Sequence, residues 1–163
     1  MGQTVVSPAG EGSVFQASET LIVETSRFGA VEVRSEAVIT MAGPILGFPA
    51  ARHFFLKCHS DNSPLMWFQS MEEPNLAFVV IDPRYILADY QPPLKPGLLK
   101  SLEAADSSSI DLLVILSIPS GGEGTITANL MAPLVINTET RLVAQPLFES
   151  SGYDCRWPVP PAA

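Results

Sequence analysis

The chain has 163 residues, 47% hydrophobic and 16% charged, a balance that suits one folded domain and argues against global disorder. Its 17 acidic and 9 basic residues give a formal net charge of -8. That charge argues against direct nucleic-acid binding, because phosphate neutralisation needs clustered lysine and arginine. It suits a basic partner, although many proteins are simply acidic.

The chain contains no apolar run near the roughly 20 residues that a membrane-spanning helix needs. Residues 1–18 lack the cationic start and the apolar stretch of a signal peptide. We therefore expect a cytoplasmic protein without membrane association. In that compartment Cys58 and Cys155 are expected to stay reduced, and their spacing matches no zinc or redox motif.

The N-terminal residues 1–18 are rich in glycine and serine and predict a flexible tail, which leaves residues 19–163 as a single domain. Strand patterns begin at once, at residues 21–25, 30–34 and 37–41. Val31 and Val33 alternate with polar neighbours, as in a half-buried antiparallel strand. Gly29 stands between the first two strands, where a hairpin needs a residue tolerant of positive φ.

Further short strands are predicted along the rest of the chain, at residues 53–59, 65–70, 76–81, 85–90, 110–118, 125–130, 134–137 and 142–148. Residues 76–81 are apolar on both faces and are expected in the centre of a sheet, whereas 85–90 end at two prolines and suit an edge. One short helix is predicted at residues 96–105. The fold class is therefore mainly β, a small antiparallel β-barrel or sandwich with one short helix.

Candidate metal ligands do not converge. On a strand His53 and His59 share one face and Cys58 points to the other, so we expect two histidines at the ends of a strand and no metal. The chain has no nucleophile elbow, P-loop or dinucleotide fingerprint. We expect no catalytic residues, no cofactor and no enzymatic activity.

Candidate contact residues for a protein partner lie near predicted loops and edges. Arg27 and Phe28 combine an arginine and an aromatic ring at a hairpin tip, a typical anchor pair, although Phe28 could instead fold back to cap the barrel. Tyr85 and Tyr90 on the expected edge strand carry the same two readings. Three carboxylates near the final hairpin could form an acidic face or simply be solvated: Glu139, Glu149 and Asp154.

Several segments along the chain carry recognisable motifs. They are residues 25–29 (Thr-Ser-Arg-Phe-Gly), 43–48 (Gly-Pro-Ile-Leu-Gly-Phe), 67–70 (Trp-Phe-Gln-Ser), 77–83 (Ala-Phe-Val-Val-Ile-Asp-Pro) and 129–137 (Asn-Leu-Met-Ala-Pro-Leu-Val-Ile-Asn), followed by Gln145, Tyr153, Arg156, Pro158 and Val159. In this order the motifs resemble those of one bacterial family, the FliW flagellar assembly factors. The resemblance covers about residues 20–160.

The resemblance implies a cytosolic protein that binds two partners, flagellin and the dimeric translational repressor CsrA. Bound CsrA cannot silence the flagellin message, and accumulating flagellin displaces it, so the logic is partner switching without substrate or cofactor. It also implies that unpolymerised flagellin exposes apolar helical faces. On this chain the candidates to cover them are the aromatics expected to be exposed near loop tips and edge strands, Phe28, Tyr85 and Tyr90. The alternative is a small-ligand-binding or enzymatic β-barrel with no flagellar role, which requires a deep apolar cavity with converging polar groups.

Overall fold

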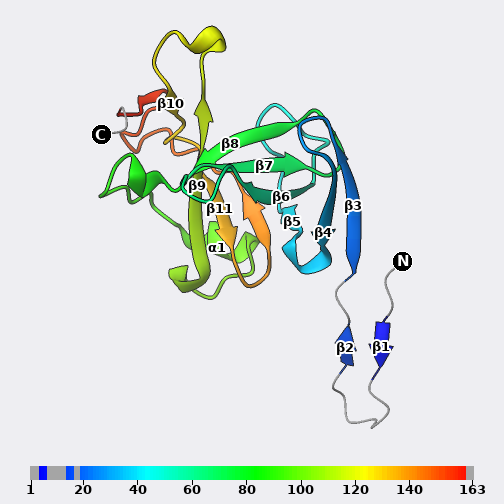
Figure 1. The fold of residues 1–163 in the computed structure, drawn as a ribbon. Helices are drawn as coiled ribbons and strands as arrows, with labels where there is room; N and C mark the ends of the chain where they lie inside the picture. The colour runs from blue at the N-terminus through cyan, green and yellow to red at the C-terminus, as the bar shows by residue number, and fades with distance from the viewer. Residues whose placement is uncertain (1–3, 7–13, 17–18, 161–163) are drawn as a thin grey trace.

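The computed structural model describes residues 4–6, 14–16 and 19–160. Seven of its strands close into a β-barrel (Figure 1). Around the barrel they follow the order β5–β6–β7–β8–β9–β11–β12, and β12 pairs with β5 to complete the circle. They are β5 (Ile39–Met41), β6 (His53–Cys58), β7 (Met66–Ser70), β8 (Ala77–Ile81), β9 (Ile110–Ser117), β11 (Leu134–Asn137) and β12 (Leu142–Ala144).

The neighbouring barrel strands pair antiparallel with one exception, the parallel pair β5 and β12. The predicted mainly β fold with one short helix is confirmed, and it takes the form of a barrel. The parallel closure was not predicted, because it joins segments about a hundred residues apart, Leu142 opposite Thr40, and alternation within a strand carries no information on its distant neighbour.

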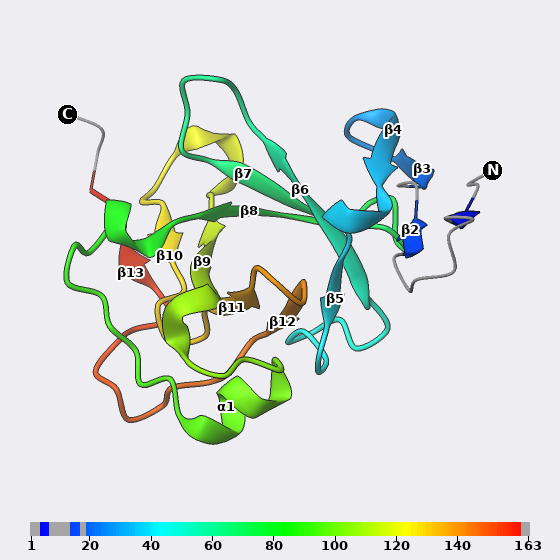
Figure 2. The ribbon, with the colours of Figure 1, turned by 90° about the horizontal axis from the view of Figure 1, so that it is seen from below.

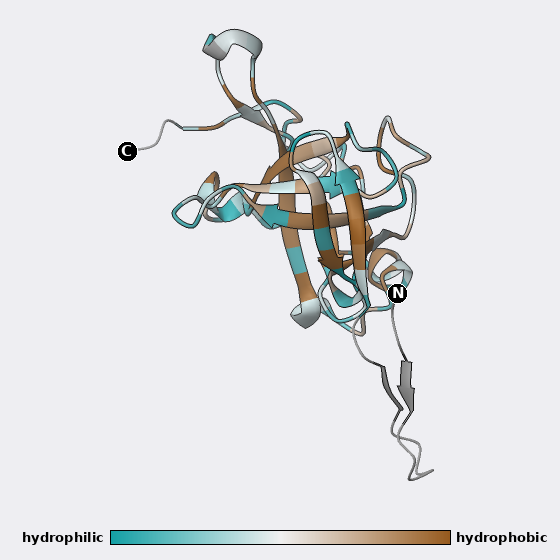
Figure 3. Ribbon diagram, turned by 45° about the vertical axis from the view of Figure 1, so that its right-hand side comes forward, coloured by the Kyte–Doolittle hydropathy of each residue, from teal (hydrophilic) through white to brown (hydrophobic). Residues whose placement is uncertain are grey.

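Alternate residues of each strand point inward and fill the barrel. These interior side chains are all nearly or fully buried: Ile39, Met41, Phe54, Phe68, Val80, Leu113, Leu134, Ile136 and Val143. The rings of Phe54 and Phe68 stack with their centroids 4.3 Å apart. Figure 3 shows that apolar residues predominate along the barrel strands, whereas the connecting loops mix polar and apolar residues.

Two segments cover the outer face of the barrel wall on opposite sides (Figure 1). On one side the hairpin of β3 (Thr20–Thr25) and β4 (Gly29–Arg34) packs Val23 and Val33 against Phe55 of β6. On the other, the C-terminal stretch with β10 (Thr127–Ala128) and β13 (Trp157–Pro158) packs over outward residues of β8 and β9. Since β8 also lies between β7 and β9, the central position predicted for residues 76–81 is confirmed.

The helix α1 (Pro96–Ser101) lies beside β11 and β12 (Figure 2). It ends earlier than the predicted residue 105, because Glu103 adopts a φ of 55° and the amide of Ala104 donates back to the Leu99 carbonyl over 2.8 Å. Buried Asn137 ties this end to the β11–β12 turn. Its Nδ2 donates to the carbonyl oxygen of Leu102 over 2.9 Å.

Three other predicted elements differ from the structure. The edge strand expected at residues 85–90 is wrong: Asp82 accepts a hydrogen bond from the Arg84 amide over 2.9 Å, and Pro83 begins a 3-10 turn that continues in further turns to Tyr90. The strand expected at residues 125–130 shrinks to β10, and the one at 142–148 stops at Ala144. There the Gln145 side chain, which donates to the Ala132 carbonyl, replaces strand pairing.

The predicted flexible tail lies largely outside the described residues. Within it, β1 (Thr4–Val6) and β2 (Val14–Gln16) pair as antiparallel strands. Tail flexibility and the single domain at 19–163 therefore stay predictions. Among the residues that the structure describes, no helix is long and apolar enough to cross a membrane.

Candidate protein-binding surfaces

The tip of the β3–β4 hairpin is held by its own sequence. The Thr25 hydroxyl accepts a hydrogen bond from the Phe28 amide over 2.8 Å and donates to the Gly29 carbonyl over 2.9 Å. Gly29 has a φ of 68°, a conformation that costs other residues energy. The Ser26 amide donates to the Pro74 carbonyl over 2.9 Å, which ties the tip to the β7–β8 loop. The Thr-Ser-Arg-Phe-Gly motif thus places its arginine and phenylalanine in fixed positions over the barrel wall.

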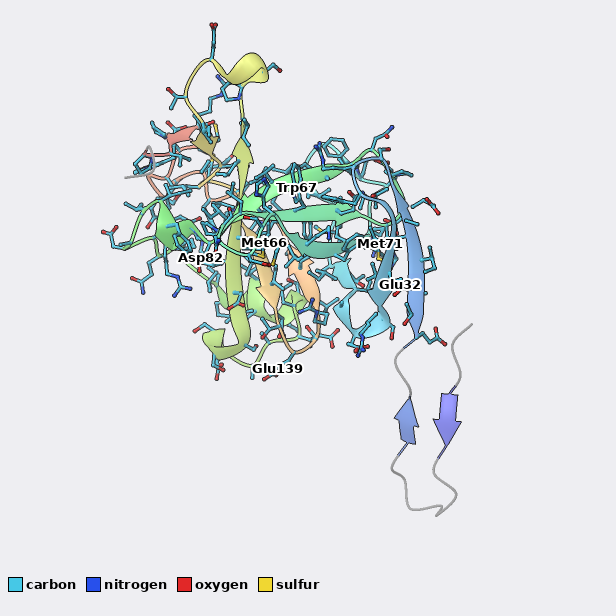
Figure 4. The ribbon with its side chains drawn as sticks, in the orientation of Figure 1. Glu32, Met66, Trp67, Met71, Asp82 and Glu139 are labelled. Carbon is cyan, nitrogen blue, oxygen red and sulfur yellow. The ribbon has the colours of Figure 1, made fainter. Side chains whose placement is uncertain are left out.

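These side chains meet a half-buried aromatic on β7, Trp67. The Phe28 ring contacts Trp67 edge-to-face, with centroids 5.8 Å apart, and the Arg27 guanidinium carbon lies 4.2 Å from the centre of the Trp67 ring. The Lys57 ammonium lies 5.3 Å from the Phe28 ring, and His59 lies 6.4 Å from Trp67. We call this group, Arg27, Phe28, Lys57, His59 and Trp67, the hairpin-tip patch; Figure 4 shows Trp67 on the barrel wall.

Phe28 is half-buried against the outer face of the wall, so it rests on Trp67 and does not close an end of the barrel. Sequence reasoning did not single out Lys57 or Trp67 as contact residues. The alternation of side chains along β7 could have identified Trp67, because Phe68 points into the barrel and its neighbour must therefore point outward. In the strand register Trp67 lies opposite Lys57.

A second surface is a groove of about 380 Å³ at the barrel end where β8 stops and β9 begins. Its floor is apolar and includes Leu56, Met66 and Leu113, which belong to the interior cluster, and its rim carries charges. The full lining comprises Ile39, Leu56, Met66, Asp82, Pro83, Arg84, Tyr90, Ile110, Asp111, Leu112, Leu113, Ile136, Thr138 and Arg141, and we call it the mouth groove. In Figure 4 Met66 and Asp82 lie close together at this end.

The rim charges of the mouth groove are held in different ways. A guanidinium nitrogen of Arg84 lies 2.6 Å from an Asp82 carboxylate oxygen, and this hydrogen bond outweighs partial burial and lowers the pKa of Asp82. Arg141 instead donates to the Ala37 carbonyl over 3.3 Å from a backbone with a φ of 62°. Ile39, Leu113 and Ile136 of the barrel interior reach this groove, and the rest of the interior holds buried side chains such as Phe54 and Phe68.

The two tyrosines expected to act alike differ completely. Tyr85 is 67% exposed and borders a depression that it shares with Asp82 and Arg84, next to the mouth groove. Tyr90 is only 6% exposed, and its hydroxyl donates to the Leu130 carbonyl over 2.7 Å. Burial, helped by nearby Tyr153, raises the pKa of Tyr90. The expected exposure of Tyr90 is wrong, since the turns after Pro83 return it to the barrel wall.

The three carboxylates expected in one cluster are exposed but lie in two places. Glu139 is in the β11–β12 turn, beside the Ile110 end of β9. Asp154 lies near Leu130, whose amide donates to its carbonyl, close to the Leu116 end. At about 3.3 Å per residue, the six steps between these ends separate them by roughly 20 Å. Glu149 lies on the same side as Asp154, because the amide of its neighbour Phe148 donates to the carbonyl of Met131, the residue next to Leu130.

The histidines of β6 serve other contacts. His53 Nδ1 lies 2.5 Å from a carboxylate oxygen of Glu72, whose other oxygen accepts from the amides of Arg52 and His53. Burial raises the pKa of Glu72, but these hydrogen bonds outweigh it and lower the pKa overall. His59 lies against Trp67. Within the described part of the chain, no three His, Cys, Asp or Glu side chains gather as a metal site.

Comparison with known proteins gives a consistent result along most of the chain. The family model of the FliW protein matches residues 22–159. A flagellar assembly factor FliW of Syntrophus aciditrophicus is 36% identical over 137 residues, which are 84% of this chain and 86% of the relative. Proteins of the same name from Bdellovibrio bacteriovorus and a Thermotoga species are 33% and 30% identical, over 85% and 83% of this chain and 79% and 91% of their own length.

The fold agrees with a solved structure as well. A crystal structure of the flagellar assembly factor FliW superposes with a TM-score of 0.78 at 28% identity, covering 86% of this chain and 98% of that one. The matched residues 22–159 include the barrel, the hairpin tip and the rim of the mouth groove.

Proposed function

Because the chain belongs to the FliW family of flagellar assembly factors, we propose that it binds flagellin and antagonises the translational regulator CsrA by partner switching in the cytoplasm. The single observation that supports this most is the family match, which runs through residues 22–159. In this role the chain holds CsrA away from the flagellin message until flagellin accumulates and takes its place. The role requires complementary surfaces and no catalysis.

The mouth groove suits the flagellin side of this exchange. An unpolymerised flagellin exposes apolar helical faces, and a chaperone must cover them with an apolar groove. The floor of the mouth groove provides such a surface, and exposed Tyr85 stands at its border. A groove of this volume accommodates several apolar side chains from one face of a helix. Tyr85 is the anchor we propose, in preference to buried Tyr90.

The carboxylates suit CsrA, whose RNA-binding surface is expected to be basic. An acidic face would speed association with it and repel the phosphates of the message. Since Glu139 lies apart from Glu149 and Asp154, only one of the two places can contact a small partner at its centre. Testing the two sites separately identifies which.

The deciding experiment is binding of the full chain to flagellin and CsrA from the same organism, by co-purification and calorimetry. We expect binding to each at micromolar concentration or better, and release of bound CsrA when flagellin is added. Binding to neither partner would overturn the proposal. Binding to both without displacement would remove the switching mechanism but keep the partners.

Variants then locate the surfaces. Tyr85→Ala is expected to weaken flagellin binding by about 2 kcal/mol, the typical cost of losing a buried anchor, while the midpoint of thermal unfolding stays nearly unchanged. Ile118→Ala, an exposed apolar residue beyond the opposite end of β9, is the matched control.

For CsrA, Glu139→Lys and the pair Glu149→Lys with Asp154→Lys are compared with Glu123→Lys. The variant at the true site slows association and weakens its salt dependence, whereas equal behaviour of all three would place the acidic contact elsewhere.

A further inference from the structure

The hairpin-tip patch is a small cationic area on a chain whose formal net charge is -8. Arg27 and Lys57 are both exposed, and they approach the patch from different elements, the hairpin tip and β6. Each lies over an aromatic ring, Arg27 over Trp67 at 4.2 Å and Lys57 over Phe28 at 5.3 Å. The aromatic rings thus hold two cations in place at the surface.

Arg27 and Lys57 have no carboxylate partner, unlike Arg34, which pairs with Glu36, and Arg84, which pairs with Asp82. Other cations of the described chain, such as Lys95 and Lys100, also lack a carboxylate within 4.0 Å, so the distinguishing feature of Arg27 and Lys57 is that each lies over an aromatic ring. Among the described residues, no carboxylate oxygen lies within 4.0 Å of the charged groups of Arg27 or Lys57. A guanidinium held over an aromatic ring can still donate N–H groups to an acceptor. The patch therefore presents donors that the protein itself does not use.

Most other residues of the family-like motifs have an evident role within the fold. Thr25 and Gly29 shape the hairpin tip. The side chain of Asn129 accepts from the Ala132 amide over 2.9 Å, and Gln145 accepts from the Leu46 amide over 2.9 Å. Arg27 has no such hydrogen bond within the described chain, and its described contact is with the ring of Trp67 on the outer side of the barrel wall. Its position is therefore better explained by a partner than by stability.

We propose that the hairpin-tip patch binds an acidic peptide segment of a partner protein. A carboxylate side chain would accept hydrogen bonds from the Arg27 edge, a second would approach Lys57, and an apolar neighbour would lie on Trp67. A depression of about 220 Å³ beside Arg27, lined also by Ser26, Pro74 and Asn75, gives room for one further side chain. This site is separate from the mouth groove and does not depend on whether that groove binds flagellin.

A nucleic acid is the less favoured occupant. Tracking a phosphate backbone requires a row of cations along the strand. The patch offers two cations with His59 beside them, on a protein whose acidic residues outnumber its basic residues by 17 to 9. A short carboxylate-bearing segment matches both the small number of cations and their fixed positions.

The test uses the full chain and fluorescence anisotropy with a labelled glutamate-rich peptide of about ten residues that contains one leucine. A peptide with glutamine in place of glutamate and an oligouridine of equal length are the comparison probes. We expect the acidic peptide to bind more tightly than either, and its affinity to fall between about 50 and 300 mM salt. Equal binding of the glutamine peptide, or tighter binding of oligouridine, would overturn the proposal.

Variants assign the binding to the patch. Arg27→Ala and Trp67→Ala are each expected to weaken acidic-peptide binding about tenfold or more, and Arg27→Lys to recover part of the loss. Arg34→Ala, on the same hairpin but paired with Glu36, is the matched control and should bind as the parent does. If Arg34→Ala weakens acidic-peptide binding as much as Arg27→Ala does, the effect comes from the overall charge of the protein and contradicts a defined site. The unfolding midpoint of each variant separates lost contacts from lost folding.

Discussion

Two aromatic clusters lie on the outer wall of the same barrel, and their polar surroundings distinguish them. In one, Tyr90 and Tyr153 meet with ring centroids 4.6 Å apart, and the Tyr90 hydroxyl is used up by the Leu130 carbonyl. In the other, Phe28 and Trp67 meet at 5.8 Å, and their neighbours are exposed cations without carboxylate partners among the described residues. The first cluster is covered by the C-terminal stretch, whereas the second remains open.

This difference shows what an aromatic residue near a turn can mean. Where its polar group finds a partner inside the chain and another segment covers it, it belongs to the core. Where it holds a cation whose donors remain unused, it forms part of a surface ready for a ligand. We therefore expect substitutions in the first cluster to lower stability and substitutions in the second to weaken ligand binding.

The largest effect is expected in the covered cluster. Tyr90→Ala should lower the free energy of unfolding by about 3–5 kcal/mol, because it leaves a cavity under the C-terminal stretch and an unpaired Leu130 carbonyl. Tyr90→Phe keeps the ring and should cost about 1–2 kcal/mol. Urea unfolding followed by far-UV circular dichroism measures both. If Tyr90→Ala lowers the free energy of unfolding by less than Tyr90→Phe does, the C-terminal stretch does not depend on this ring.

The hairpin tip should respond through its backbone. A Cβ added at Gly29 meets nothing within 4 Å, so Gly29→Ala tests only the cost of its φ of 68°. That cost is about 1–2 kcal/mol for an L-residue, and Gly29→Asn should lose less because asparagine tolerates this conformation better. Urea unfolding of both variants measures it. If Gly29→Ala unfolds as the parent does, the tip adapts freely and the patch is not held in advance.

The open cluster should contribute little to stability. Trp67→Ala removes a half-buried ring that contacts Phe28 and Arg27 outside the filled interior, and we expect a loss of about 1 kcal/mol. Combined with the expected loss of acidic-peptide binding, this is the reverse of the Tyr90 result. A loss near that of Tyr90→Ala would remove the distinction between the clusters and make Trp67 a core residue.

The sequence predicted the elements whose pattern is local. Residues 53–59, 65–70, 76–81 and 110–118 became β6, β7, β8 and β9 with small changes at their ends, because alternation and turn residues lie within each segment. Gly29 likewise marked the hairpin correctly. The motif resemblance identified the family, which the full comparison confirmed.

What the sequence could not predict depends on contacts between distant segments. Tyr90 is buried by Leu130 and Tyr153, 40 and 63 positions away, so its local context of turns and prolines suggested an exposed edge. The approach of Arg27 to Trp67 likewise joins residues 40 positions apart. The separation of Glu139 from Asp154 follows from which end of β9 each loop adjoins. Such placements come from topology, and topology follows from pairing that alternation does not encode.

The smallest effect concerns a paired charge, in contrast to the unpaired cations of the open cluster. Asp82 is bonded to Arg84, with Asp111 contributing to the field at Arg84, and its pKa is lowered below the unfolded value. A lowered carboxylate pKa stabilises the fold above the unfolded pKa, and that contribution is lost as pH falls through the folded pKa. Asp82→Asn keeps an acceptor for the Arg84 amide but removes the charge. Because the pair is partly exposed to solvent, we expect it to lower the free energy of unfolding by only about 0.5 kcal/mol at pH 7.

As the pH is lowered from 7 to about 2, the difference between the Asp82→Asn variant and the parent should shrink, because the parent carboxylate takes up a proton as the pH falls through its lowered pKa. Urea unfolding at the two pH values measures the difference. Arg27→Ala is the matched control, since its cation has no carboxylate partner among the described residues and should leave the acid dependence unchanged. A difference between Asp82→Asn and the parent that persists at low pH would assign the effect to the turn geometry at Pro83. A change in acid dependence for Arg27→Ala would show that the open cluster has a carboxylate partner after all.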